Sequence, residues 1–187
     1  ALINKDSNIT LENININPTR NGLLIVLEKM GANIKIFNQK TIAGEIVADI
    51  NVKSSELSGC ELDKEMAKLM IDEFPILSVA ASQANSPSCF KGLDELRVKE
   101  SDRLELINNN LKRCGCYSEV KNNNLFINPS KNKEIINPEI RTDFDHRIAM
   151  SFAVLGSKIG KLQINESDSI NTSFPSFKEQ FNRAGGN

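Results

Sequence analysis

The chain has 187 residues, of which 40% are hydrophobic and 25% are charged, a composition typical of a folded globular domain rather than a disordered or fibrous chain. Its 23 Lys and Arg residues nearly balance its 24 Asp and Glu residues, so no global positive field indicates nucleic acid or an anionic membrane as a partner. Any anion site must therefore be local, and the apolar runs are too short to span a bilayer.

The first predicted elements are helices that end in glycine. Three amphipathic runs finish with a basic residue, a small or apolar residue and then Gly31, Gly115 or Gly185. This pattern predicts a helix C-terminus capped by glycine in all three places.

Period-two alternation after the first two glycines predicts pairs of strands separated by Asn-rich or Gly-containing turns. The predicted strand pairs are 33–37 with 41–46, and 117–120 with 125–127. Further helices are predicted at about 74–84 and 144–157, and further strands near 88–92 and 161–165. Repetition of a helix, glycine cap, strand, turn and strand predicts one domain of packed α+β units with buried helices, because each unit leaves an apolar helix face for its neighbours to cover.

The stretch 95–104, ELRVKESDRL, concentrates charge just before a segment with helical periodicity. Ser101 and Asp102 are predicted to start the helix. Lys99 and Arg103 then flank its N-terminus, where unpaired N–H groups and basic side chains together form a local anion site. Glu100 lies between them as a carboxylate whose proton affinity a bound anion would raise. The alternative interpretation is a solvated helix cap with surface ion pairs.

Two other helix starts carry charge. Asp72 and Glu73 precede a helix that a proline initiates and whose following residues are almost all apolar, so Asp72 is either a cap or a base. His146, the only histidine, stands beside Arg147 at the start of another apolar helix. A lone histidine is more often a capping or packing residue than a metal ligand.

Three charged helix starts in one repeat protein can face a single cleft. Such a cleft would hold acids, bases and cations for a multiply charged substrate. The candidate residues are Asp72, Lys99, Glu100, Arg103, His146 and Arg147.

Motifs that the chain lacks narrow the functional class. It contains no Walker A loop, G-x-G-x-x-G, H-E-x-x-H or G-x-S-x-G motif, and nothing in it requires a cofactor or a metal.

Its four cysteines have no histidine cluster or second cysteine pair nearby to complete a zinc site, so we interpret them as reduced, buried thiols. Because Ala1 does not open a signal peptide either, we expect a cytoplasmic location. The cysteines are Cys60, Cys89, Cys114 and Cys116.

Several segments, in this order, resemble the C-terminal half of the 5-enolpyruvylshikimate-3-phosphate (EPSP) synthase family, from about residue 9 to the end. The pair RVKESDR and DHRIAMS, with IDE ahead of them, is the most specific part of the resemblance. The segments are NPTRNGLLIVLEKMGA (17–32), MIDEFPILSVAA (70–81), GLDELRVKESDRL (92–104), DFDHRIAMS (143–151) and NTSFPSF (171–177).

The resemblance implies an enzyme of the shikimate pathway of aromatic amino acid biosynthesis. Such an enzyme transfers the enolpyruvyl group of phosphoenolpyruvate to the 5-hydroxyl of shikimate 3-phosphate and releases phosphate. The fold implied has two similar domains, each of three βαβαββ units, with helix N-termini directed at the cleft between them. Residues 1–187 would be the C-terminal domain, supplying one wall of the cleft, and we expect no turnover without the N-terminal domain as partner.

Roles are implied residue by residue. Asp72 matches the aspartate that contacts the shikimate 5-hydroxyl and is proposed to remove its proton, and Lys99 matches a lysine on the same substrate. Glu100 matches the glutamate proposed to handle the proton at the methylene carbon of phosphoenolpyruvate. Arg103 and Arg147 match arginines that bind its carboxylate.

Other positions are less closely defined by the resemblance. His146 lies beside the carboxylate site without an assigned role. Some members carry a phosphate-binding lysine where this chain has Thr172, which places the chain with the TSFP subgroup and leaves the phosphate to other cations. Two alternatives are the enolpyruvyl transferase of the same fold that acts on UDP-N-acetylglucosamine, and a noncatalytic binding domain derived from the enzyme.

Overall fold

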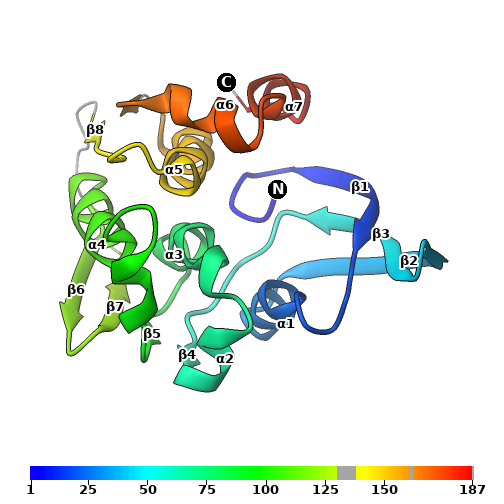
Figure 1. Ribbon diagram of the computed structural model, residues 1–187, viewed down its shortest axis with the longest axis horizontal. Coiled ribbons are helices and arrows are strands. Elements are labelled where there is room, and N and C mark those ends of the chain that lie inside the picture. The colour runs from blue at the N-terminus through cyan, green and yellow to red at the C-terminus, as the bar shows by residue number, and fades with distance from the viewer. Residues whose placement is uncertain (130–137, 161, 187) are drawn as a thin grey trace.

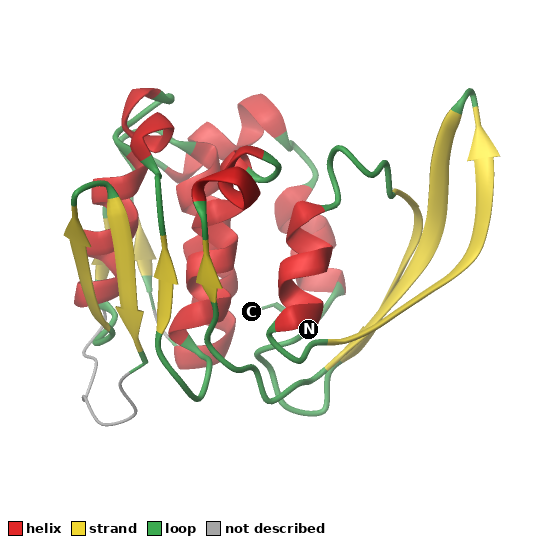
Figure 2. Cartoon of the chain, turned by 90° about the horizontal axis from the view of Figure 1, so that it is seen from below, coloured by secondary structure: helices red, strands yellow, loops and turns green. Residues whose placement is uncertain are grey.

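The computed structural model describes residues 1–129, 138–160 and 162–186. Within these ranges the chain forms three sheets with the strand orders β1-β3-β2, β4-β5-β7-β6 and β8-β9. Figure 1 shows the chain running from the β1-β3-β2 sheet, through the helices α3 and α4, to α5, α6 and α7. The turned view shows the helices side by side, with short strands along one side and the long strands of the first sheet on the other (Figure 2).

The middle of the chain forms one complete βαβαββ unit. Strands β4 and β5 are parallel, β5 and β7 antiparallel, and β7 and β6 form an antiparallel hairpin. The elements in order are β4 (Glu61–Leu62), α2 (Lys64–Lys68), η1 (Ile71–Glu73), α3 (Phe74–Ser82), β5 (Ser88–Phe90), η2 (Asp94–Val98), α4 (Arg103–Arg113), β6 (Tyr117–Lys121) and β7 (Asn124–Asn128).

The parts on either side each repeat a portion of this unit. In the first part, strand, helix and hairpin give the order β1-β3-β2, which matches β5-β7-β6; in the last part, β8 and β9 are parallel, as β4 and β5 are. The predicted repetition of one α+β unit is confirmed. The elements are β1 (Asn8–Asn15), α1 (Gly22–Lys29), β2 (Asn33–Ile42), β3 (Glu45–Lys53), β8 (Glu139–Ile140), α5 (His146–Ile159), β9 (Gln163–Ile164), η3 (Ser167–Ser169), α6 (Ile170–Ser173) and α7 (Phe177–Arg183).

Helix α3 lies at the centre of the core and packs against both α4 and α5. All but one of its nine residues are buried, which explains why its sequence is apolar without a polar stripe. Its first residue, Phe74, meets Phe90 of β5 edge to face with ring centroids 5.5 Å apart. This packing fixes the start of α3 relative to the sheet.

The predicted glycine caps are confirmed at all three helix ends. Each glycine has a positive φ, between 78° and 90°, and the next residue donates a backbone hydrogen bond to a carbonyl in the last helical turn. These bonds run from Ala32 to Leu27, from Cys116 to Leu111 and from Gly186 to Phe181.

Replacing Gly31 by alanine should lower the free energy of unfolding by about 1–2 kcal/mol, because an L residue is strained at its φ of 90°. An added Cβ would lie 3.6 Å from the nearest atom, the carbonyl oxygen of Glu56, which is ordinary contact, so backbone strain alone is measured. Urea unfolding checks this, with Glu28→Ala on the exposed face of the same helix expected to change stability by less than about 0.5 kcal/mol. Equal stability of the two variants would contradict the cap.

The first predicted turn is wrong. Residues 38–40 were expected to separate two strands, but β2 continues to Ile42 and the turn lies at Ala43 and Gly44. The register shifts between Phe37 and Lys40, where Asn38 adopts a φ of 51° and its side chain donates to Asp49 on β3. A polar bulge within a strand therefore has the same sequence signature as a turn.

Other boundaries agree with prediction to within a few residues. Helix α3 ends at Ser82, β5 is confined to residues 88–90, and α5 begins at His146 because Asp145 is its N-cap. Residue 161, the first of the predicted strand near 161–165, lies outside the described residues, and the strand β9 occupies the middle of that range.

Candidate active site

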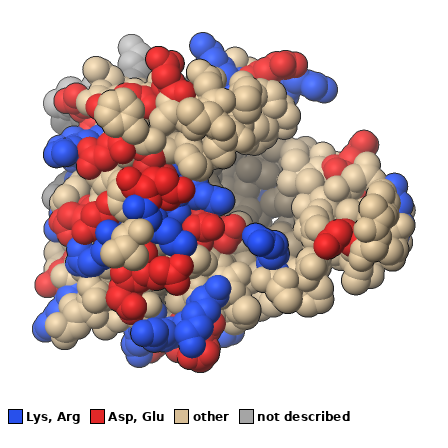
Figure 3. Space-filling model, in the orientation of Figure 1, with Lys and Arg blue, Asp and Glu red and all other residues tan. Residues whose placement is uncertain are grey.

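The starts of α3, α4 and α5 bring the predicted charged side chains together. Figure 3 shows Lys and Arg intermixed with Asp and Glu on the face over α3 and α4, beside a hollow that separates this part from the first sheet. Ion pairs connect residues of all three helix starts, so the predicted convergence is confirmed for Asp72, Arg103 and Arg147.

Asp72, in the single turn η1 before α3, is the meeting point of the cations. Its Oδ1 lies 3.0 Å from Arg103 Nη1 and 3.4 Å from Lys99 Nζ. Its Oδ2 lies 3.9 Å from Arg147 Nη2, and its backbone carbonyl accepts a hydrogen bond from Arg147 Nη1 at 3.2 Å. The Asp72 side chain caps neither η1 nor α3, so of the two predicted roles, the cap is excluded.

Arg103, the first residue of α4, is fully buried, which is unusual for an arginine. Each nitrogen of its guanidinium meets a different carboxylate: Nη1 meets Asp72, Nη2 meets Glu100 and Nε meets Asp145 at 2.7 Å. The guanidinium therefore bridges the two carboxylates predicted as base and acid, Asp72 and Glu100.

Helix α4 begins where the sequence predicts. Asp102 is its N-cap, and its Oδ1 accepts from the backbone N–H of Glu105 at 3.0 Å. Its other oxygen pairs with Arg97 Nη1 at 2.8 Å near the surface. The cap leaves Glu100 outside the helix with a half-exposed side chain, reachable from solvent.

Lys99 has two carboxylate neighbours. Its Nζ lies 2.8 Å from Glu95 Oε1 in addition to its contact with Asp72. The hydrogen bond that Lys99 donates to Glu95 is the largest cause of the raised pKa of Lys99, so the ammonium stays charged. Glu95 was not among the predicted site residues, although its position four residues before Lys99 is a sequence signal for such a pair.

Arg147 and His146 are the first two residues of α5. Arg147 reaches Asp72 and lies 3.8 Å from Glu73, whereas His146 is half-buried and has no side-chain hydrogen bond or ion pair among the residues that the structure describes. Of the two roles expected for a lone histidine, capping or packing, the capping role belongs to Asp145, whose carboxylate accepts from the backbone N–H groups of Arg147 and Ile148.

The cluster holds more carboxylates than cations. Counting the side chains that form its ion pairs, five carboxylates surround three cations. Anion binding by this face alone is therefore opposed by its own charge. The carboxylates are Asp72, Glu73, Glu95, Glu100 and Asp145, and the cations are Lys99, Arg103 and Arg147.

The chain matches the family model described as EPSP synthase (3-phosphoshikimate 1-carboxyvinyltransferase) over residues 1–181. The chain belongs to the EPSP synthase family. The 3-phosphoshikimate 1-carboxyvinyltransferase of Petrotoga mobilis is 43% identical over 190 residues, an alignment that covers 98% of this chain and 42% of that protein. The same enzyme of Paramagnetospirillum magneticum is 42% identical over 186 residues, with 99% of this chain and 42% of that protein covered.

Solved structures agree with this assignment. EPSP synthase from Acinetobacter baumannii superposes with a TM-score of 0.93 at 38% identity, covering 100% of this chain and 43% of that one. The enolpyruvyl transferase NikO from Streptomyces tendae superposes with a TM-score of 0.70 at 13% identity over 97% of this chain and 39% of that one, a likeness of fold alone. The chain thus spans about two fifths of the length of the EPSP synthases it matches, and the predicted fold class is confirmed.

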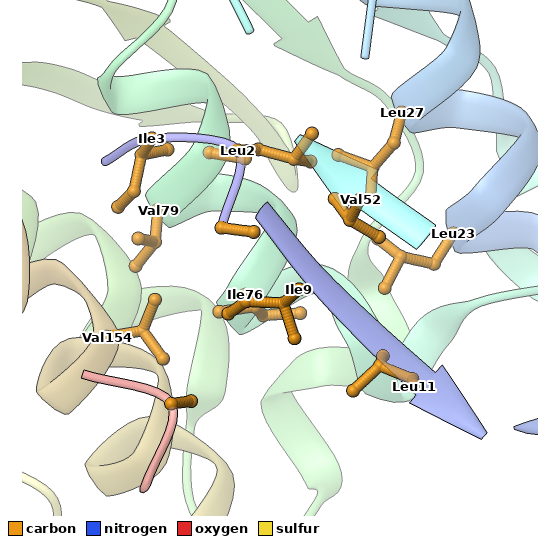
Figure 4. A pocket seen from close by; sticks show the side chains of 13 residues that line it. Leu2, Ile3, Ile9, Leu11, Leu23, Leu27, Val52, Ile76, Val79 and Val154 are labelled. Carbon is orange, nitrogen blue, oxygen red and sulfur yellow. The ribbon is translucent and has the colours of Figure 1, made fainter. Parts of the chain in front are cut away.

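The hollow between the first sheet and the helices of this EPSP synthase family member differs in character from the charged cluster. Its volume is about 360 Å³, and it lies where the first sheet meets α1, α3 and α5. Figure 4 shows the side chains of Leu11, Leu23, Ile76 and Val154 directed into it. Because every lining residue is apolar, this hollow offers nothing to a charged substrate, and the charged cluster is the candidate site.

The predicted burial of the cysteines is confirmed for Cys114 and Cys116 but not for Cys60 and Cys89. Cys60, Cys89 and Cys114 are free thiols; Cys114 is buried and the other two are half-buried. Burial raises the pKa of the Cys114 thiol to about 12, which makes it an inert packing residue.

In the part of the chain that the structure describes, no helix combines the length and apolar character needed to cross a membrane.

Opposing effects act on the Asp72 carboxyl. Partial burial alone would raise its pKa, but its cationic neighbours outweigh burial and the net pKa lies below the ordinary value. The stability that these cations confer is therefore present above the unfolded-state pKa of about 4 and is lost as pH falls through the lower folded-state pKa. We expect the difference in unfolding free energy between wild type and Asp72→Asn to shrink on acidification below about pH 4.

Glu73 provides the opposite case for the same measurement. Burial is the largest effect on its carboxyl and raises its pKa. Its contribution is therefore most favourable at low pH and declines as pH rises from the unfolded-state pKa of about 4 through the folded-state value. Urea titrations of wild type, Asp72→Asn and Glu73→Gln across pH 3–7 give the difference in unfolding free energy between wild type and each variant. This difference should change with pH in opposite directions for the two variants. The same direction for both would contradict the assigned environments.

Proposed function

We propose that this chain forms one wall of the active site of a 3-phosphoshikimate 1-carboxyvinyltransferase. The reaction transfers the enolpyruvyl group of phosphoenolpyruvate to the 5-hydroxyl of shikimate 3-phosphate and releases phosphate. The observation that carries the proposal is Arg103, a buried cation that holds Asp72 and Glu100 on one guanidinium at the junction of three helix starts. Family membership supplies the reaction class.

The chemistry needs a base at oxygen and an acid at carbon. Asp72, whose lowered pKa keeps it ionised at neutral pH, takes the proton of the 5-hydroxyl as that oxygen bonds to C2 of phosphoenolpyruvate. Glu100 delivers a proton to the methylene carbon. Elimination reverses both proton transfers: C3 returns a proton to Glu100, the double bond forms again, and phosphate leaves C2 with the proton that Asp72 had taken.

The cations of the cluster bind and orient the two anions. Lys99 contacts shikimate 3-phosphate, while Arg103 and Arg147 bind the carboxylate of phosphoenolpyruvate, with His146 beside them. Fixed cations of this kind stabilise developing charge without reorganisation. We assign no cofactor to the reaction, because proton transfer and charge stabilisation by these side chains account for each step.

A second wall follows from the charge of the site. The cluster has more carboxylates than cations, so two multiply charged anions require further positive groups from outside it. We propose that residues 1–187 are the C-terminal domain of a two-domain enzyme, and that an N-terminal domain supplies those groups. Under this proposal the chain alone is inactive, and we place the enzyme in the cytoplasm.

The test is phosphate release from phosphoenolpyruvate and shikimate 3-phosphate. It compares this chain alone with a joined enzyme, in which the chain is fused to the part of the Petrotoga mobilis protein that it does not cover. We expect turnover by the joined enzyme only, and loss of that turnover in its Asp72→Asn form. Circular dichroism and thermal unfolding establish that each protein is folded.

Other outcomes would change the assignment. Turnover by the chain alone would contradict the need for a second wall. A folded joined enzyme that binds shikimate 3-phosphate without releasing phosphate would favour the noncatalytic binding domain. Phosphate release with UDP-N-acetylglucosamine in place of shikimate 3-phosphate would favour the enolpyruvyl transferase of cell-wall synthesis.

A further inference from the structure

Asp145 is a buried carboxylate to which the reaction scheme gives no role. It is fully buried and accepts hydrogen bonds from four donors. Its Oδ1 accepts from the backbone N–H groups of Arg147 and Ile148 at the start of α5, at 2.9 Å and 3.3 Å. Its Oδ2 accepts from Ser101 Oγ at 2.9 Å and from Arg103 Nε at 2.7 Å, both at the start of α4.

The two oxygens of this carboxylate thus tie together two helix starts. The residue that Oδ2 holds, Arg103, and the residue whose backbone Oδ1 holds, Arg147, are the two arginines assigned to the carboxylate of phosphoenolpyruvate. Asp145 therefore fixes the Arg103 guanidinium relative to the backbone from which the Arg147 side chain extends. A charge-assisted contact at Nε also fixes the plane of the Arg103 guanidinium.

The three carboxylates on Arg103 differ in burial. The side chain of Asp145 is 0% exposed, whereas those of Asp72 and Glu100 are 39% and 53% exposed. An incoming carboxylate can compete for Nη1 and Nη2, which face the exposed partners, but cannot reach Nε.

We propose that Asp145 is a positioning residue that anchors Arg103 through Nε and so sets its place relative to the start of α5. The other two guanidinium nitrogens, Nη1 and Nη2, are then left to release Asp72 and Glu100 and to bind a substrate carboxylate in their place. The inference rests on the proposed function for the identity of that substrate, phosphoenolpyruvate. The anchoring itself rests on the geometry of the buried contact.

Asp145→Asn separates the two roles of the side chain. Asparagine is a good N-cap, so its carbonyl oxygen keeps the contacts to α5, while its amide replaces the charged acceptor that faces Arg103. Asp102→Asn is the matched control, because Asp102 is also an N-cap and also pairs with an arginine, Arg97, outside the substrate site.

Two readouts test the proposal. In the chain alone, the 1H–15N signal of Arg103 Nε, assigned by its disappearance in Arg103→Lys, should exchange slowly in wild type and in Asp102→Asn, and should shift and lose protection in Asp145→Asn. In the joined enzyme, Asp145→Asn should raise the KM for phosphoenolpyruvate about tenfold or more, since misplaced binding groups weaken productive binding. A purely structural defect would instead lower kcat through lost folded enzyme and leave KM unchanged.

The outcomes separate the two proposals. An unchanged Arg103 Nε signal and an unchanged KM in Asp145→Asn would overturn the positioning role. A joined enzyme without turnover, combined with loss of the Nε signal in Asp145→Asn, would overturn the proposed function and support the anchoring. If Asp145→Asn does not fold, Ser101→Ala takes its place, because it removes one donor from Asp145 Oδ2. This variant should shift the Arg103 Nε signal in the same direction. An unshifted signal would contradict the anchoring.

Discussion

Replacing Glu100 by glutamine is expected to lower kcat of the joined enzyme by about 100- to 10,000-fold, the range for loss of a general acid or base. Glutamine keeps the size of the side chain and can still accept from Arg103 Nη2, but it cannot carry the proton to and from the methylene carbon. Because the Glu100 side chain is half exposed, the change leaves no buried charge unpaired and the fold should persist.

The measurement pairs turnover with exchange at carbon. In deuterated water the wild type should place deuterium in the methylene group of phosphoenolpyruvate, and Glu100→Gln should lose this exchange together with turnover. Glu105→Gln makes the same substitution in the first turn of α4, at a side chain outside the cluster that, within the described residues, accepts a side-chain hydrogen bond only from Asn109, and should keep both activities. Normal exchange in Glu100→Gln would show that another group handles the proton.

The repeated fold is visible in the sequence because its signals are local. A glycine that must adopt positive φ, an N-cap followed by an apolar helix and a period-two strand each occupy fewer than about ten residues. Asn38 shows the limit of such signals, since a polar residue with positive φ serves equally in a turn and in a bulge. Pairing with β3, which the local sequence does not encode, decides between the two.

The sequence predicted which residues form the candidate site better than it predicted the contacts between them. The sequence identifies three helix starts as charged and predicts that they face one another. The ion pairs of Asp72 with Arg103 and with Arg147 agree with that prediction. Asp145 was missed, although an aspartate directly before an apolar helix is an N-cap signal. What the sequence does not reveal is that its second oxygen meets Arg103, 42 residues earlier in the chain.

The balance of charge in the site also required the structure. From the sequence, Lys99, Arg103 and Arg147 could be interpreted as cations available to an anion. In the folded chain each of them already contacts at least one carboxylate. Under the proposed function, substrate binding by this wall is therefore an exchange of carboxylate partners, and its strength depends on how firmly each present partner is held.

Asp145 is the most deeply buried of these partners. Arg103→Met is therefore expected to lower the free energy of unfolding by about 3–5 kcal/mol, the cost of leaving a buried charge without its partner. Methionine fills much of the volume of arginine without a donor, so the Asp145 carboxylate keeps only the hydroxyl of Ser101 and two backbone N–H groups. Adding Asp145→Asn to this variant removes the unpaired charge and should recover part of the loss. Urea unfolding of wild type, both single variants and the double variant gives the coupling energy.

The pair Arg97 and Asp102 provides the comparison for this cycle. It has the same residue types and a similar separation, 2.8 Å, but its side chains are 34% and 41% exposed. Solvent screening should reduce its coupling energy to about 0–1 kcal/mol. A coupling for Arg103 and Asp145 no larger than this would mean that burial adds nothing to the contact. The Arg103 guanidinium would then be free to follow the substrate, and its position would have to be set by the exposed carboxylates Asp72 and Glu100 instead.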